Sequence, residues 1–207
     1  NIFFHKVRTD TERRSNLSLW CTSIQCKPDL QKLRIFVGPP LLEQFEEYAG
    51  IDEETARKAV EIYRERYAPI GIFENELYPG IEEMLSGLKN RGYKLAIASS
   101  KPEVFVKIVA EHFHIDSYFD EMVGSEPEGG RTNKTEVIEE ALKRLGLSEH
   151  RDQVMMVGDK EHDVFGARRA GLECIAVSYG YGTEEELENA HPYKIVNSAE
   201  EILDFFA

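Results

Sequence analysis

The sequence has little cysteine, no long apolar run and no excess of positive charge. Its 207 residues include only 3 Cys and 1 Trp. Cys21, Cys26 and Cys174 are too few for a disulfide scaffold, and the first two form a CxxxxC pair with no second pair to complete a zinc site. This cysteine usage is typical of a reducing cytoplasm. No segment approaches the roughly 18 apolar residues of a membrane span. We therefore expect a cytoplasmic protein with no membrane partner.

The charge balance excludes one class of partner and marks one segment as unusual. The formal net charge is −13, which argues against a nucleic-acid binder. The 42% hydrophobic and 30% charged content is typical of a globular chain of one or two domains. Residues 1–27 differ from the rest, because they carry five basic and only two acidic residues.

Apolar segments alternate with amphipathic ones from Tyr78 onward. Strands are predicted at 94–98, 122–123, 154–157 and 174–177, and helices at 80–90, 102–113, 132–145, 161–170 and 198–206. Such alternation predicts an α/β fold, a Rossmann-like parallel sheet flanked by helices. Residues 28–77 instead show helical patterns at 41–49 and 53–67, which predicts a small helical insert.

Two carboxylates follow the strand predicted at 154–157. If a helix begins near Glu161, Asp159 and Asp163 can face the same point. Paired carboxylates at the C-terminal edge of a parallel sheet suit Mg²⁺, which binds through carboxylate, phosphate and water oxygens. The alternative is an Asp-capped helix with a solvated second Asp.

Two further segments at strand ends or in the loops after them carry groups that suit a phosphate. Ser99 and Ser100 follow one strand, where a hydroxyl and the amides of a helix N-terminus can hold an anion, although a plain Ser N-cap is the alternative. Lys134 lies near a predicted helix start, where its charge opposes the helix dipole and indicates an anionic partner, unless it is a solvated surface lysine. A hydroxyl, a lysine and a carboxylate pair in this order favour phosphoryl transfer.

The order and spacing of these motifs resemble the haloacid dehalogenase (HAD) superfamily, in particular its phosphoglycolate-phosphatase-like branch with a helical cap. The resemblance covers about residues 28–207. It implies that Ser99 is the phosphate-binding hydroxyl, with Ser100 beside it, that Lys134 is the third-motif lysine, and that Asp159 and Asp163 are the metal acids.

Other segments also resemble that branch, namely Arg34, Gly38–Leu41, Tyr78–Gly80 and Gly180–Gly182. Among them, Arg34 is the candidate for binding a substrate carboxylate or phosphate. The resemblance further implies a core domain of residues 1–14 and 78–207 and a helical cap domain of residues 15–77.

The first motif of the family, an apolar strand followed by Asp-x-Asp-Gly-Thr, is not recognisable. The candidate strand is 2–4, and in that register His5 stands at the nucleophile position and Val7 at the acid/base position; Asp10 is the nearest carboxylate. One hypothesis is that residues 5–27 are a reading-frame or sequence error or a decayed gene segment. The other is a genuine degenerate motif in a protein that binds phosphate without catalysis.

The resemblance implies a Mg²⁺-dependent phosphatase that acts on a small phosphorylated metabolite such as phosphoglycolate, through an aspartyl-phosphate intermediate. The expected partner is a small-molecule phosphate ester, and the expected assembly is a monomer or weak homodimer. The alternatives are a pseudophosphatase that binds phosphate ligands and a phosphosugar mutase, which needs the same missing Asp pair.

Overall fold

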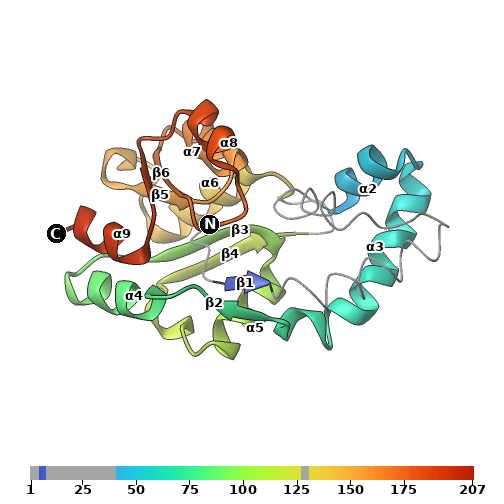
Figure 1. The fold of residues 1–207 in the computed structure, drawn as a ribbon, viewed down its shortest axis with the longest axis horizontal. Coiled ribbons are helices and arrows are strands. Elements are labelled where there is room, and N and C mark those ends of the chain that lie inside the picture. Colours follow the sequence, from blue (N-terminus) through green and yellow to red (C-terminus); the bar gives the residue numbers. More distant parts are fainter. Residues whose placement is uncertain (1–4, 8–40, 127–130) are drawn as a thin grey trace. The chain divides into compact units, whose positions relative to one another are not determined.

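The computed structural model describes residues 5–7, 41–126 and 131–207 (Figure 1). These residues form two compact units, of which the larger spans Leu77–Ala207 and the smaller contains the described residues between His5 and Glu76. No helix in the described ranges is both long enough and apolar enough to cross a membrane.

The larger unit alternates strands with helices, which confirms the predicted pattern. Its elements in chain order are α4 (Ile81–Asn90), β3 (Ala96–Pro102), α5 (Glu103–His112), η3 (Asp116–Tyr118), β4 (Glu121–Ser125), α6 (Lys134–Leu145), η4 (Arg151–Gln153), β5 (Met155–Gly158), α7 (Glu161–Arg169), β6 (Glu173–Val177), α8 (Glu184–Ala190), β7 (Lys194–Val196) and α9 (Ala199–Phe205). The sequence analysis missed β7, a strand of only three residues.

Among the described residues, the parallel strands of this unit pair in two groups, which agrees with the predicted parallel α/β arrangement. β3 pairs with β4, and β5, β6 and β7 pair in that order, all in parallel. The two sheets are joined by a shared core, since Ile97 of β3 lies in the same buried cluster as Val157 of β5 and Ile175 of β6.

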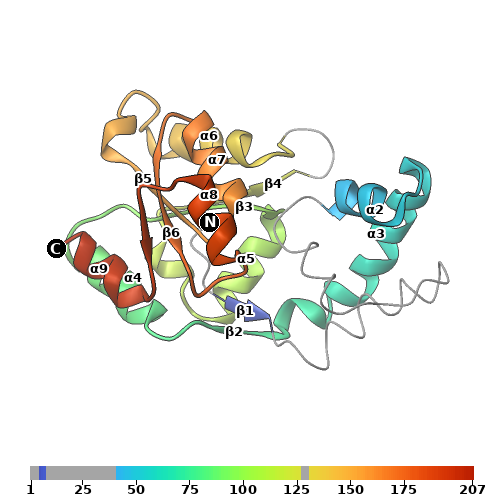
Figure 2. The same cartoon turned by 45° about the horizontal axis from the view of Figure 1, so that its top comes forward.

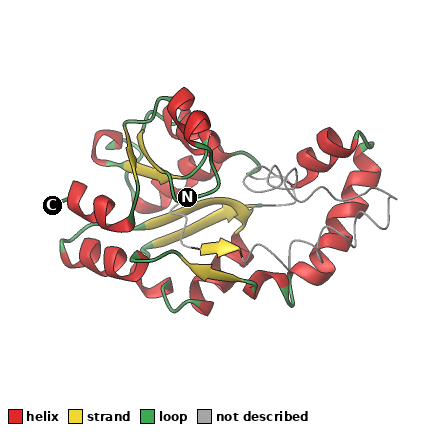
Figure 3. Ribbon diagram, in the orientation of Figure 1, coloured by secondary structure: helices red, strands yellow, loops and turns green. Residues whose placement is uncertain are grey.

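Alternating strand residues produce a layer of helices on each face of the sheets. Ile97, Val157 and Ile175 pack with α4, α5 and α9. Their neighbours Ala98, Met156 and Cys174 pack with α6 and α7. Because side chains alternate along a strand, each strand contributes to both cores. Figures 1 and 2 show these two groups of helices on opposite sides of the strands, and Figure 3 shows the strands between them.

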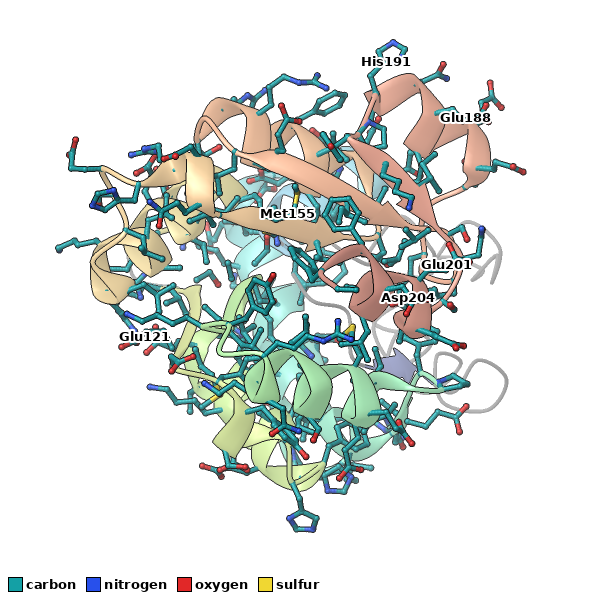
Figure 4. The ribbon with its side chains drawn as sticks, turned by 90° about the vertical axis from the view of Figure 1, so that its left-hand side faces the viewer. Glu121, Met155, Glu188, His191, Glu201 and Asp204 are labelled. Carbon is teal, nitrogen blue, oxygen red and sulfur yellow. The ribbon has the colours of Figure 1, made fainter. Side chains whose placement is uncertain are left out.

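Local sequence sets the ends of these helices and the charge of their outer faces. Asn133 caps α6 by accepting a hydrogen bond from the backbone of Glu136, and Gly146 ends the helix in the left-handed conformation (φ +71°). At the end of α8, Glu188 and His191 are exposed and point away from the strands (Figure 4). These two side chains thus face solvent, while the apolar stripes of the helices face the sheets.

The smaller unit contains two helices and a pair of short strands. Its elements are β1 (His5–Val7), α2 (Leu41–Ala49), α3 (Glu53–Tyr67), η2 (Gly71–Phe73) and β2 (Asn75–Leu77), the last of which ends at the first residue of the larger unit. Both helices match their predicted ranges. α2 packs against α3, with Phe45 and Ala56 fully buried, and Arg66 pairs with Glu74 at 2.6 Å.

A short strand lies just after the candidate strand at 2–4. The chain forms strand β1 at 5–7, and β1 pairs with β2, a strand that the sequence analysis missed. His5 and Val7 therefore lie within a strand of the smaller unit. The expected core domain of residues 1–14 and 78–207 stays a prediction. The candidate strand 2–4, Asp10, Arg34 and the expected domain boundary at 14/15 lie outside the described residues.

Candidate active site

Lys134 and Asp163 form a buried ion pair between two helices. The Nζ atom of Lys134, the first residue of α6, lies 3.0 Å from Oδ1 of Asp163 in the first turn of α7. Only 8% of the lysine side chain and 3% of the aspartate side chain are exposed. Lys134 also donates a hydrogen bond to the carbonyl oxygen of Ala98 on β3 at 3.2 Å. The lysine thus connects the β3 sheet with the helix that follows β5, and it is not a solvated surface residue.

The carboxylate of Asp163 has both oxygens engaged. While Oδ1 contacts Lys134, Oδ2 accepts hydrogen bonds from the backbone amides of Asp159 at 3.1 Å and Lys160 at 3.2 Å. Burial opposes ionisation of Asp163, but the charge and hydrogen bond of Lys134 outweigh that effect and lower its pKa. Asp163 is therefore not the solvated residue of the alternative interpretation.

Asp159 follows directly after β5 and is fully buried. Its Oδ2 accepts a hydrogen bond from the backbone amide of Tyr181 at 2.7 Å, and its carbonyl oxygen accepts one from the amide of Gly182 at 2.9 Å. Its Oδ1 is buried and has no hydrogen-bond partner among the described residues. Burial, together with the neighbouring Asp163, raises the pKa of Asp159.

Ser99 and Ser100 lie half-buried near the end of β3. The Ser99 hydroxyl accepts a hydrogen bond from the amide of Lys101 at 3.2 Å, in the part of β3 where its register with β4 shifts. Pro102, and not a serine, is the N-cap residue of α5. Because Lys134 bonds to the carbonyl of the residue before Ser99, these serines lie beside the Lys134–Asp163 pair.

The carboxylates fit a magnesium ion in one respect. A buried carboxylate oxygen without a partner is costly, and a hard cation satisfies it. Asp159 Oδ1 is such an oxygen. A cation there needs further oxygen ligands, since the described residues contain no cluster of three or more His, Cys, Asp or Glu able to hold a metal. Mg²⁺ commonly uses only one or two carboxylates and completes its shell with water and phosphate.

Comparison with known proteins identifies the family to which this chain belongs. A family profile described as haloacid dehalogenase-like hydrolase matches residues 17–177. This chain belongs to the haloacid dehalogenase-like hydrolases. The match begins before residue 28, where the sequence resemblance was expected to start, and so includes the end of the unusual N-terminal segment.

Relatives of this HAD chain are named as enzymes that transfer or hydrolyse phosphoryl groups. A 5'-nucleotidase from Pseudomonas aeruginosa is 45% identical over 166 residues, which cover 80% of this chain and 74% of the nucleotidase. The tyrosine-protein kinase PtkA of Mycobacterium tuberculosis is 33% identical over 163 residues, 79% of this chain but only 55% of PtkA. Relatives named phosphoglycolate phosphatase are also found, which agrees with the expected branch.

Solved structures agree with the fold. A predicted phosphatase from Clostridium acetobutylicum superposes with a TM-score of 0.91 at 40% identity, covering 98% of this chain and 93% of that one. The α/β fold class predicted from the sequence is thereby confirmed.

The structure brings together Lys134, Asp159 and Asp163, and Ser99 directly follows Ala98, whose carbonyl accepts the Lys134 hydrogen bond. The roles of these residues stay a prediction. The structure also reveals contacts that the sequence analysis did not predict. The amides of Tyr181 and Gly182 hold Asp159, although the sequence analysis noted Gly180–Gly182 only as a resemblance. Backbone donors leave no side-chain signature, so only the flanking glycines could have signalled this role.

Proposed function

We propose that this HAD chain provides the phosphate-binding and Mg²⁺-binding half of a phosphomonoesterase for small phosphorylated metabolites. The observation that carries this proposal is the buried Oδ1 of Asp159, which has no partner among the described residues and belongs to the residue whose amide bonds to Asp163 of the Lys134–Asp163 ion pair. Asp159 would hold Mg²⁺ through that oxygen. Asp163 would position Lys134 and the backbone after β5, because both of its oxygens are already engaged.

Each residue has a defined part in binding the phosphoryl group. Lys134 would place its positive charge against phosphoryl oxygens, and its pairing with Asp163 fixes where that charge lies. The Ser99 hydroxyl would orient one phosphoryl oxygen at the end of β3. A bound Mg²⁺ would supply charge neutralisation and polarise the phosphoryl group.

Hydrolysis through an aspartyl-phosphate also needs a nucleophile and an acid/base group. In the expected register these positions hold His5 and Val7, and neither residue type supplies the oxygen nucleophile or the carboxylic acid. We therefore propose that this exact chain binds phosphate esters but turns them over poorly or not at all. A binding role without catalysis is the second candidate function, and the absent Asp-x-Asp favours it.

A hydrolysis assay tests the proposal. A generic phosphomonoester, phosphoglycolate and a 5'-nucleotide would be supplied to this chain and to the His5→Asp, Val7→Asp double variant, with Mg²⁺ or with a chelator. We expect no turnover by the chain itself and Mg²⁺-dependent turnover by the double variant, which is lost again when Asp159→Asn is added. The best of the three substrates would identify the substrate class.

Two outcomes would contradict the proposal. Asp159-dependent turnover by the unaltered chain would show that a nucleophile exists elsewhere, with Asp10 the first residue to test. An inactive double variant that still binds phosphate would favour the binding role. Sequencing the coding DNA, together with the intact mass, separates a genuine segment 5–27 from a reading-frame error.

The remaining expectations also belong to this proposal. The partner is a small-molecule phosphate ester, the compartment is the cytoplasm, and the assembly is a monomer or weak homodimer. The net charge of −13 supports the absence of a nucleic-acid partner. Light scattering across a concentration series measures the assembly state, and a stable higher oligomer would contradict it.

A further inference from the structure

The turn at Gly180–Gly182, which follows β6, contacts Asp159 on two sides. The amide of Tyr181 donates a hydrogen bond to the carboxylate at 2.7 Å, and the amide of Gly182 donates one to the Asp159 carbonyl at 2.9 Å. One bond fixes the side chain and the other fixes the backbone of the same residue. The turn therefore holds Asp159 across 22 residues of sequence.

The glycines of this turn permit the close approach. A Cβ atom at Gly180 would lie 2.2 Å from Cβ and 2.5 Å from Oδ2 of Asp159. A Cβ atom at Gly182 would lie 2.3 Å from the Asp159 carbonyl oxygen, which belongs to the backbone and has little freedom to move. Any side chain at either position would push the turn away from Asp159 and break its hydrogen bonds.

The contacts of the turn also select which oxygen of Asp159 is presented. Tyr181 takes Oδ2, while Oδ1 is left buried without a partner among the residues that the structure describes. Neither of these two hydrogen bonds of the turn involves Asp163. Its two carboxylate oxygens contact Lys134 and the backbone amides of Asp159 and Lys160. The turn thus fixes which oxygen of Asp159 is engaged, while Lys134 and the backbone amides engage both oxygens of Asp163.

We propose that Gly180–Gly182 is a positioning turn, whose backbone amides orient Asp159 so that one carboxylate oxygen is presented to a divalent cation. This inference deepens the proposed function and rests on it for the identity of the cation. Groups that orient metal ligands typically change metal affinity about 10- to 100-fold when they are mutated. The proposal predicts an effect of that size from a change that removes no ligand atom.

The test compares Gly180→Ala with Thr183→Ala. Thr183 accepts a hydrogen bond from the amide of Glu186 at 3.1 Å and caps α8 just after the turn, but it makes no hydrogen bond with Asp159 among the described residues. Removing such a cap destabilises a helix N-terminus without touching the Asp159 hydrogen bonds. Thr183→Ala thus reports what general loosening of this segment does.

Binding of Mn²⁺, used as a spectroscopic probe for Mg²⁺, would be measured by electron paramagnetic resonance on the full chain and both variants. We expect Gly180→Ala to weaken Mn²⁺ binding at least 10-fold and Thr183→Ala to change it less than about 3-fold, a contrast that a merely structural role would not give. Equal weakening in both variants, or none in Gly180→Ala, would overturn the proposal.

A second measurement does not depend on the metal. Amide hydrogen exchange by NMR should show protection at both Tyr181 and Gly182 in the unaltered chain. Asp159→Ala removes the carboxylate but keeps the carbonyl, so the Tyr181 amide should lose protection while the Gly182 amide keeps it. Unchanged Tyr181 protection would overturn the positioning role. If the exchange pattern is as expected but no Mn²⁺ binds, the claim of a cation site would be contradicted in both this inference and the proposed function. The hydrogen bonds between the turn and Asp159 would still be supported.

Discussion

The two aspartates after β5 have different surroundings, although the sequence presents them as a pair. Their spacing predicted that both would face one point, and the structure places their backbone and side-chain atoms within hydrogen-bond distance. The sequence could not predict which of them would have an oxygen without a partner among the described residues. That depends on Lys134, which comes from α6, and on Tyr181, which comes from the turn after β6.

Asp163→Asn tests the residue-scale account. The substitution keeps the size of the side chain but leaves the buried Lys134 ammonium without its counter-charge, which should cost about 3–5 kcal/mol of unfolding free energy. Urea unfolding measures the loss. Adding Lys134→Met should restore part of the stability, because no buried charge then remains. A double variant that loses the sum of the two single effects would contradict the ion-pair account.

At the scale of elements, helix α7 approaches α6 closely at Gly166. A Cβ atom there would lie 2.4 Å from Cγ and 2.9 Å from Cβ of Lys134, near the root of a side chain that Asp163 holds in place. The glycine therefore allows the ion pair to form between the two helices. The sequence analysis predicted both helices but not this contact, since a glycine within a helical pattern carries no information about its neighbours.

Gly166→Ala should therefore destabilise the chain by about 1–3 kcal/mol through overpacking, despite the higher helix propensity of alanine. Gly87→Ala in α4 is the matched control. Its Cβ would meet only the end of the Leu203 side chain at 2.8 Å, which can shift. We expect Gly87→Ala to change stability by less than about 1 kcal/mol. Equal losses in urea unfolding of the two variants would contradict the close-approach account.

Also at the scale of elements, Glu103 links helix α5 to α6 and to the segment before α6. Its carboxylate contacts Arg131 of the segment before α6 at 3.1 Å and Arg144 of α6 at 3.2 Å. Partial burial opposes ionisation, but hydrogen bonds from Arg144 and Lys107 outweigh it and lower the pKa from its ordinary 4.5 to about 2. A depressed pKa contributes stability above the unfolded-state value, and that stability is lost as the pH falls toward 2.

Glu103→Gln should accordingly cost about 1 kcal/mol at pH 7, a value discounted for solvent screening. The stability difference between the variant and the unaltered chain should shrink between pH 4.5 and pH 2. Urea unfolding at several pH values measures it, and a difference that does not depend on pH would contradict the ion-pair origin.

At the scale of the whole molecule, the sequence predicted the α/β alternation but not how the strands join. Apolar runs and helical stripes predicted helices α4, α5, α6, α7 and α9. Strand pairing depends on contacts between distant segments, and β3–β4 and β5–β7 form separate sheets in the described residues. Likewise β1 and β2 are too short to give a periodic signal.

Ligand-linked stability is a property of the whole chain. If Mg²⁺ and inorganic phosphate bind the folded state alone, each should raise the melting temperature, and the two together should raise it more than the sum, because a phosphate oxygen can complete the metal shell. Differential scanning calorimetry with either ligand and with both measures this. Independent, additive shifts would contradict a shared site.

The most direct test of the central claim is a calorimetric titration of inorganic phosphate into the unaltered chain in the presence of Mg²⁺, with Asp159→Asn measured in parallel. The account predicts saturable phosphate binding that requires Mg²⁺ and is lost in Asp159→Asn. Phosphate binding of equal strength in both proteins, or no binding by the unaltered chain, would contradict it.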